Sequence, residues 1–285
     1  MFMHDSYLLG SFDEYNFKFL VADCSSAVSE VIKRQKLSDS SRELVGKAMI
    51  GSFFLAGMVK EETVVNIQLE GEGEIERVLA YSDRIGRMRG MAKHSSVLAD
   101  KKDITLGIGK GFFKVTRWGG EQKLQQSVTK MERIPFESNL LNHIETSDQI
   151  VSFLSIHSTQ TGEETDIVRG LFLQALPYTP QEKIDRLLNR LNDMDMSVED
   201  LFKGTLEETL SVMENVLSAK SKVYDTGVPE FYCSCSADKI KTVILSIGRE
   251  EAFSIIAEIG KIEISCEFCH ETYTFDAEET RLLFL

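Results

Sequence analysis

The chain has 285 residues and a net charge of −13 at pH 7, with 42% hydrophobic and 27% charged residues. This composition excludes a disordered polymer, and the length favours about two domains. No run approaches the roughly 18 apolar residues of a membrane span. The opening segment, MFMHDSYLLGSFDEYN, has no basic stretch followed by an apolar one, as a signal peptide would. We therefore expect a cytoplasmic protein that has no membrane partner.

Residues 1–176 are expected to form an N-terminal core domain of mixed α and β structure. Alternating apolar residues predict half-buried strands, and apolar residues at helical spacing predict helices. The expected elements are a strand at Tyr15–Ala22, helices at Ser25–Leu37 and Asp39–Val59, and strands at Val65–Leu69, Ile75–Tyr81, Ile104–Lys114, Ile150–His157 and Ile167–Leu176. The glycine-rich segment 107–111 lacks the spacing of a phosphate-binding loop, so we expect a hairpin turn there.

Residues 177–226 are expected to form a helical linker with three helices. Thr179-Pro180-Gln181-Glu182 predicts a capping box, and Ser197 and Thr205 predict the starts of two further helices. Each helix has an apolar stripe but is too short to be stable alone. The apolar residues are Ile184, Leu187, Leu188, Leu191, Leu206, Leu210, Met213 and Leu217. The stripes must dock on another surface, either as an ordinary helical subdomain or as a linker whose docking is conditional.

Four of the five cysteines lie near the C-terminus, as Cys233-Ser-Cys235 and Cys266-Glu-Phe-Cys269. Two close pairs separated by about thirty residues predict a four-thiolate zinc site, because zinc takes four ligands at tetrahedral corners. In a cytosolic protein, clustered cysteines are more often metal ligands or redox groups than structural disulfides. A purely structural zinc remains an alternative.

Two other features near the cysteines have competing interpretations. Cys266-Glu-Phe-Cys269-His270 fits the attachment motif of c-type haem, but this would leave the first cysteine pair unexplained. We interpret His270 as a surface residue, and modulation of the neighbouring thiolate is the alternative. Cys24 lies far from the cluster in sequence and is interpreted as a buried apolar residue without a function.

Residues 227–285 are expected to form a small C-terminal zinc-binding domain. Helices are expected at Ser236–Ile247 and 249–258, and strands are expected on either side of the second cysteine pair. About sixty residues of modest apolar content make a marginal core, so folding should depend on the metal. The segment carries five Lys or Arg and eleven Asp or Glu. This charge opposes a phosphate-binding surface, so we expect no nucleic-acid partner.

The chain resembles the thirty-three-kilodalton heat-shock protein family of redox-regulated holdase chaperones. The resemblance rests first on the order Cys-x-Cys, about thirty residues, Cys-x-x-Cys. Further matching segments are Val65–Ile75, Gly109–Gly111, Gly170–Pro177, Ile255–Glu263 and Tyr273–Asp276. Residues 118–165 match poorly, and 157–164 look shortened, which places the client-binding surface and dimer contacts of the first domain in question.

The resemblance implies an α+β protein with no enzymatic activity, which acts as an ATP-independent chaperone. It implies one zinc ion held in the reduced, inactive state by Cys233, Cys235, Cys266 and Cys269. Oxidants would form Cys233–Cys235 and Cys266–Cys269 disulfides, release zinc and loosen the helical linker. The exposed apolar surface would then bind unfolding client proteins, often in a homodimer.

Two functions of other classes remain as alternatives. One is a zinc-dependent nucleic-acid-binding protein, which the acidic balance of 227–285 opposes. The other is a thiol–disulfide oxidoreductase that uses Cys266 and Cys269. That chemistry needs the Cys-x-x-Cys motif at the start of a helix in a thioredoxin-like context, whereas here the motif lies between two expected strands.

Overall fold

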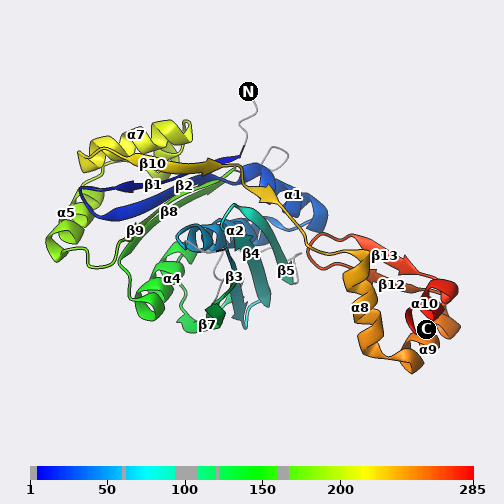
Figure 1. Cartoon of the computed structure of the whole chain (residues 1–285). Helices are drawn as coiled ribbons and strands as arrows, with labels where there is room; N and C mark the ends of the chain where they lie inside the picture. The colour runs from blue at the N-terminus through cyan, green and yellow to red at the C-terminus, as the bar shows by residue number, and fades with distance from the viewer. Residues whose placement is uncertain (1–4, 60–61, 94–107, 120–121, 160–166) are drawn as a thin grey trace. The chain divides into compact units, whose positions relative to one another are not determined.

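The structure, a computed structural model, has two compact units, Met1–Tyr232 and Cys233–Leu285. It describes residues 5–59, 62–93, 108–119, 122–159 and 167–285 (Figure 1). The predicted α+β class is confirmed by the helices and sheets of both units. No helix in the described part of the chain has the length and hydropathy that a membrane crossing needs.

The first unit contains two sheets and the helices that cover them. Its elements are β1 (Ser6–Phe12), β2 (Phe17–Asp23), α1 (Ser25–Gln35), α2 (Asp39–Gly57), β3 (Thr63–Gly71), β4 (Arg77–Asp83), β5 (Arg87–Lys93), β6 (Gly111–Gly119), β7 (Gln122–Met131), α4 (Phe136–His143), the π-helical turn η1 (Ile144–Asp148), β8 (Ser152–Thr159), β9 (Ile167–Ala175), α5 (Gln181–Asn192), α6 (Val198–Leu201), α7 (Leu206–Leu217), β10 (Lys222–Gly227) and β11 (Glu230–Phe231).

These elements stack in layers (Figure 1). The first sheet has the order β10-β1-β2-β9-β8, and the second has the order β11-β5-β4-β3-β6-β7. Helix α2 lies between them and contacts strands of both. The largest apolar core joins α1, α2 and α4 to the inner faces of the two sheets. Neighbouring strands are antiparallel, except for the short parallel pairing of β11 with β5.

The central strands β1, β2 and β9 of the first sheet are buried on both faces. In β2, Leu20 and Ala22 face the core around α2, whereas Phe17, Phe19 and Val21 face a second core on the other side. A strand that is covered on both faces is apolar at nearly every position instead of alternating. Burial on both faces explains why β2 is apolar at nearly every position. Its outer face is covered by the residues of the second core.

Helices α5, α6 and α7 cover the outer face of the first sheet. Their buried residues in the second core are Ile184, Leu187, Leu191, Leu201, Leu206, Leu210, Met213 and Leu217. The sheet contributes Leu8, Phe12, Phe17, Phe19, Val21, Leu171 and Leu173. The Tyr15 hydroxyl donates to the Leu217 carbonyl at 2.7 Å, and the chain then pairs as β10 with β1. The apolar stripes of these helices are therefore docked.

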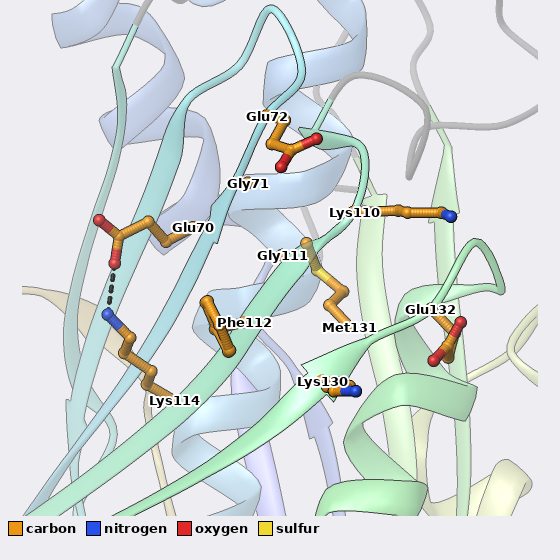
Figure 2. A pocket seen from close by; sticks show the side chains of 10 residues that line it. All are labelled: Glu70, Gly71, Glu72, Lys110, Gly111, Phe112, Lys114, Lys130, Met131 and Glu132. Carbon is orange, nitrogen blue, oxygen red and sulfur yellow. Dashed lines mark hydrogen bonds and ion pairs between the residues drawn. The ribbon is translucent and has the colours of Figure 1, made fainter.

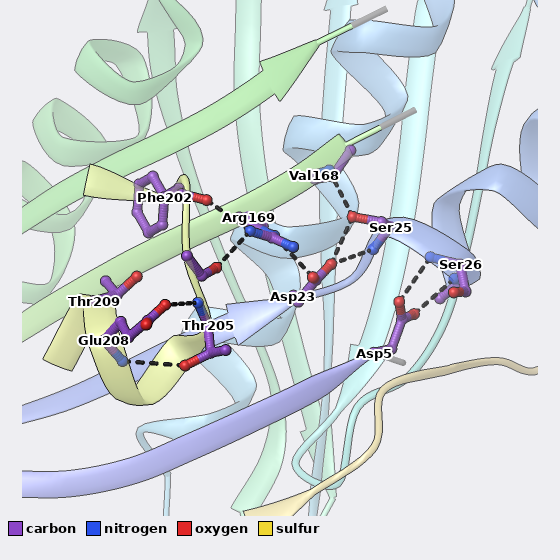
Figure 3. A network of polar contacts seen from close by, with 12 residues as sticks. Asp5, Asp23, Ser25, Ser26, Val168, Arg169, Phe202, Thr205, Glu208 and Thr209 are labelled. Carbon is purple, nitrogen blue, oxygen red and sulfur yellow. Dashed lines mark hydrogen bonds and ion pairs between the residues drawn. The ribbon is translucent and has the colours of Figure 1, made fainter. Parts of the chain in front are cut away.

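A buried arginine fastens the turn between α6 and α7 to the sheet (Figure 3). Arg169 on β9 donates through Nε to the Asp23 carboxylate at 2.8 Å. Its Nη1 donates to the carbonyls of Phe202 and Gly204 at 2.6 and 2.9 Å. Both charged side chains are almost completely buried. Removing one partner of such a pair leaves an uncompensated buried charge, which typically costs about 3–5 kcal/mol.

The start of α5 corrects one prediction. The helix begins at Gln181, Pro180 occupies the N-cap, and no side chain caps the helix. The Thr179 hydroxyl instead donates to the carbonyls of Asn16 and Leu176. The predicted capping box is therefore wrong, because the N-cap position falls one residue later, on Pro180, whose side chain cannot accept a hydrogen bond. Ser197 and Thr205, in contrast, cap α6 and α7 as predicted.

The segment around the predicted strand Ile104–Lys114 also differs. Its first residues, 104–107, lie outside the described residues, and β6 begins only at Gly111. The residues just before β6 contact the β3–β4 connection, where the Ile108 carbonyl accepts from the Gly73 amide and the Lys110 carbonyl accepts from the Glu72 amide. A Cβ at Gly111 would lie 1.9 Å from the Glu70 carbonyl oxygen, so close backbone approach requires glycine there.

The second unit has few buried residues. Its elements are α8 (Ala237–Ile247), α9 (Arg249–Ile259), β12 (Ile262–Ser265), β13 (Thr272–Phe275) and α10 (Ala277–Leu283). Its fully buried core consists of Ile240, Ile244, Ala252, Ile262 and Phe275. Five buried side chains supply little hydrophobic free energy for a unit of this size. The unit therefore needs a further source of stability.

Candidate metal centre

All four C-terminal cysteines converge within the second unit. Cys266 and Cys269 lie at the tip of the β12–β13 hairpin, and Cys233 and Cys235 lie in the loop before α8. The four sulfur atoms lie within 4.8 Å of one another. The Sγ atoms of Cys233 and Cys266 are 3.7 Å apart, and those of Cys235 and Cys269 are 3.3 Å apart.

The sulfur cluster has the dimensions and chemistry of a tetrahedral metal site. Four sulfurs at the zinc–thiolate distance of about 2.3 Å lie about 3.8 Å from one another. The observed separations are close to this value. Four soft thiolate ligands in tetrahedral arrangement favour zinc or an iron–sulfur centre over oxygen-preferring metals. The residues present therefore fit a four-coordinate thiophilic metal.

Local backbone geometry holds the second pair in place. The Cys266 amide donates to the Glu271 carbonyl, and the His270 amide donates back to the Cys266 carbonyl, each at 2.9 Å. His270 adopts a left-handed conformation with φ of 57°, which closes the turn. These bonds fix the chain around the two sulfurs, so that both point to the same side of the hairpin tip.

The first pair is held by the start of α8. Ser236 caps the helix by accepting from the Lys239 amide, and the Lys239 ammonium donates to the Ser234 carbonyl at 2.5 Å. The positive end of a helix dipole favours nearby negative charge. The Cys235 side chain lies directly before this cap, at the N-terminal end of α8.

Tyr273 contributes a contact that the sequence interpretation did not assign. It lies on β13 opposite Ile264, and its hydroxyl donates to the Cys235 sulfur at 3.2 Å. This hydrogen bond raises the pKa of Tyr273, so the phenol keeps its proton. Burial raises the pKa of the Cys269 thiol, so ionisation there requires a compensating positive charge such as a bound metal. The sequence signal for this contact was an aromatic residue, Tyr273, in the strand that follows the second cysteine pair.

Cys24 and His270 lie outside the cluster. Cys24 precedes α1, is completely buried, and burial raises its thiol pKa well above the usual value. A buried protonated thiol is unreactive. His270 is exposed and is not among the residues whose ligand atoms converge on the site. Both placements agree with the interpretation that neither residue is a ligand.

The position of the Cys-x-x-Cys motif bears on the redox-enzyme and haem alternatives. Cys266 and Cys269 lie between two antiparallel strands, whereas thioredoxin-like catalysis places the motif at the start of a helix. Both sulfurs are also grouped with those of Cys233 and Cys235, which neither alternative requires. The arrangement therefore favours metal ligation over both alternatives.

The first unit contains a pocket whose lining carries charges of both signs (Figure 2). It has a volume of about 620 Å³ and lies beside the β3–β4 turn and the β6–β7 hairpin. Its lining includes the three acids Glu70, Glu72 and Glu132 and the three lysines Lys110, Lys114 and Lys130. Lys114 pairs with Glu70. The balanced charges favour neither an anion nor a cation, and no histidine, cysteine or hydroxyl group is among the described residues that line it.

Comparisons with known proteins relate both the sequence and the architecture of this chain to one family. The family model described as "Hsp33 protein" matches residues 5–276. The 33 kDa chaperonin of Thermodesulfovibrio yellowstonii is 25% identical over 91% of this chain and 92% of its own. That of Bacillus velezensis is 27% identical over 90% of each chain.

A crystal structure of the 33 kDa chaperonin from Thermotoga maritima has a TM-score of 0.88 at 26% identity, and the match covers 98% of this chain and 97% of the other. The similarity therefore includes the layered first unit and the cysteine-bearing second unit in the same order. With a family model that matches almost the whole length, the chain belongs to the Hsp33 protein family and has a chaperone function.

Proposed function

We propose that this protein is a redox-regulated, ATP-independent holdase that binds unfolded client proteins after oxidation. The observation that supports this most directly is the cluster of four cysteine sulfurs in a unit with a small apolar core. In the proposed reduced state, Cys233, Cys235, Cys266 and Cys269 hold one zinc ion. Zinc bound by four thiolates supplies folding free energy to small domains, on the order of 10–16 kcal/mol.

The ligands of the proposed site are also its oxidant sensor. Thiolates are the oxidisable form of cysteine. One molecule of hydrogen peroxide oxidises two thiolates to one disulfide and is reduced to two hydroxide ions. We propose the pairs Cys233–Cys235 and Cys266–Cys269, which are close in sequence. Oxidation of both pairs removes all four sulfur ligands, so the metal is released and the second unit loses its main source of stability.

Chain continuity provides a route from the second unit to the linker. Tyr232 alone separates Cys233 from β11, which contributes only two residues to its sheet, and β10 lies shortly before β11. A short edge pairing has little stability of its own. Unfolding of the second unit frees one end of this segment, so that β11, β10 and then α7 can detach in turn.

Detachment of the linker uncovers the proposed client-binding surface. The outer face of the first sheet carries Leu8, Phe12, Phe17, Phe19, Val21, Leu171 and Leu173, which contact α5–α7 in the docked state. Exposed, this apolar face and the stripes of the helices would bind the apolar segments that unfolding proteins present. The same exposure would favour association into a homodimer, and no catalytic step is required.

We predict one zinc per purified reduced chain, bound by four sulfur atoms. Serine in place of Cys233, Cys235, Cys266 or Cys269 should strongly reduce the metal content, because a hydroxyl is a poor substitute for a thiolate. Cys24→Ser is the matched control and should keep full zinc. X-ray absorption and metal analysis measure the ligands and the stoichiometry. A nitrogen ligand, or loss of zinc in Cys24→Ser, would contradict the assignment.

We predict that hydrogen peroxide with mild warming releases the zinc and starts holdase activity in the same sample. Zinc can be followed with a chromogenic chelator, and activity by suppression of the aggregation of a thermally unfolded client. Mass spectrometry should find the two disulfides within the pairs. Links mainly between Cys233 and Cys266 or between Cys235 and Cys269 would disprove the pairing, and zinc release without activity would disprove the switch.

The double variant Leu187→Ser/Leu191→Ser should be an active holdase without oxidant and with zinc still bound. Both leucines are buried against the sheet, and losing a buried leucine side chain typically costs about 2–5 kcal/mol. The control is Val198→Ser, because Val198 is exposed on α6. Aggregation assays under reducing conditions measure the outcome. A double variant that is folded, zinc-bound and protease-sensitive in 177–226 but inactive would show that linker release is not the switch.

A further inference from the structure

The hydroxyl of Tyr273 is held against the sulfur cluster by elements that fix its position. The residue lies on β13, directly opposite Ile264 on β12, and its ring is partly buried against the core of the second unit. The hydroxyl donates to the Cys235 sulfur at 3.2 Å. Strand pairing and ring packing therefore aim the phenol at one of the four sulfurs.

We propose that Tyr273 is a positioning residue that slows oxidation of the cysteine cluster by holding a hydrogen bond on the Cys235 sulfur. This inference rests on the proposed function, because it concerns the rate of the proposed switch. Tyr273 is not one of the four proposed ligands, and in this proposal it helps to determine how much oxidant the switch requires.

The physical reason lies in the electron pair that the oxidant requires. In the reaction with peroxide, a sulfur lone pair attacks one peroxide oxygen, the O–O bond breaks and hydroxide leaves. A second thiolate then attacks the resulting sulfenic acid, which forms the S–S bond and releases a second hydroxide. The Tyr273 hydroxyl occupies a lone pair of Cys235 and withdraws charge from the sulfur. Both effects lower its nucleophilicity, and hydrogen bonds to ligand atoms are known means of tuning metal sites.

The test compares Tyr273→Phe with Thr272→Val in the full-length zinc-loaded protein. Phenylalanine keeps the ring and removes only the hydroxyl. The matched control removes a hydroxyl from the same strand, since Thr272 bonds to the Ser265 hydroxyl across the hairpin at 2.8 Å and not to a sulfur. Zinc release at a fixed peroxide concentration is followed with a chromogenic chelator. Release from Tyr273→Phe should be faster on the order of tenfold, the size expected for a hydrogen bond to a charged group.

A second readout does not depend on oxidation. With cobalt(II) in place of zinc, the sulfur-to-metal charge-transfer absorption reports the electron density on the sulfurs. Removal of the hydrogen bond should shift this band of Tyr273→Phe to lower energy, whereas Thr272→Val should match the wild type. An unchanged band, or a peroxide-driven rate equal to that of the wild type, overturns the proposal.

Release from Tyr273→Phe that is equally accelerated without peroxide would show a structural role and would also overturn the proposal. These outcomes are distinguishable from failure of the proposed function. If peroxide releases no zinc and starts no holdase activity in the wild type, the switch itself is wrong. If the wild type switches normally and Tyr273→Phe switches at the same rate, only the role of Tyr273 is wrong.

Discussion

The convergence of four cysteine sulfurs is the interaction on which, in the proposed mechanism, the second unit depends. Five buried apolar residues and a short hairpin form its core. Several large apolar side chains of the unit are substantially exposed, including Ile259 and Leu282, each at 63%. A unit with so little buried apolar surface is marginal without a cross-link or a metal. The proposed mechanism uses this dependence, because the groups that stabilise the unit are also the groups that an oxidant removes.

The first unit, in contrast, has a large buried apolar core. Its central core joins helices to both sheets. Helix α2 contacts strands of both sheets, and its side chains form a large part of this core. Helices α5–α7 contact the rest of the first unit less extensively, because they cover only the outer face of one sheet. Their attachment nevertheless includes the buried Arg169 interaction with Asp23 and the α6–α7 turn. In the proposed mechanism, these contacts hold α5–α7 in the docked state, and their release would leave the main core intact.

The sequence predicted those features that depend on local patterns. Cysteine spacing predicted the grouping of Cys233, Cys235, Cys266 and Cys269, and capping residues predicted the starts of α6 and α7. A local pattern was also available for α10 and was not used: Asp276 and Glu279 form a capping box at its start. These elements follow from interactions between residues a few positions apart.

The features that were missed depend on distant partners. Strand β10 is largely polar and exists because it pairs with β1, more than two hundred residues earlier. Thr179 bonds to carbonyls of the first sheet region instead of capping α5. The hydroxyl of Tyr273 reaches Cys235 only because the hairpin folds back towards α8. Arg169 likewise finds its partners in two distant segments, the end of β2 and the α6–α7 turn. None of these pairings is encoded in the spacing of neighbouring residues.

Hydrogen exchange measured by mass spectrometry tests the central claim most directly, by comparing the reduced zinc-loaded protein with the peroxide-activated protein. The proposed mechanism predicts that amide protection is lost in the second unit and in α5–α7, while α2 and the strands β3, β4 and β6 keep theirs. Retained protection of α5–α7 in a sample that has lost its zinc and is active as a holdase would contradict the coupling of the metal site to the linker.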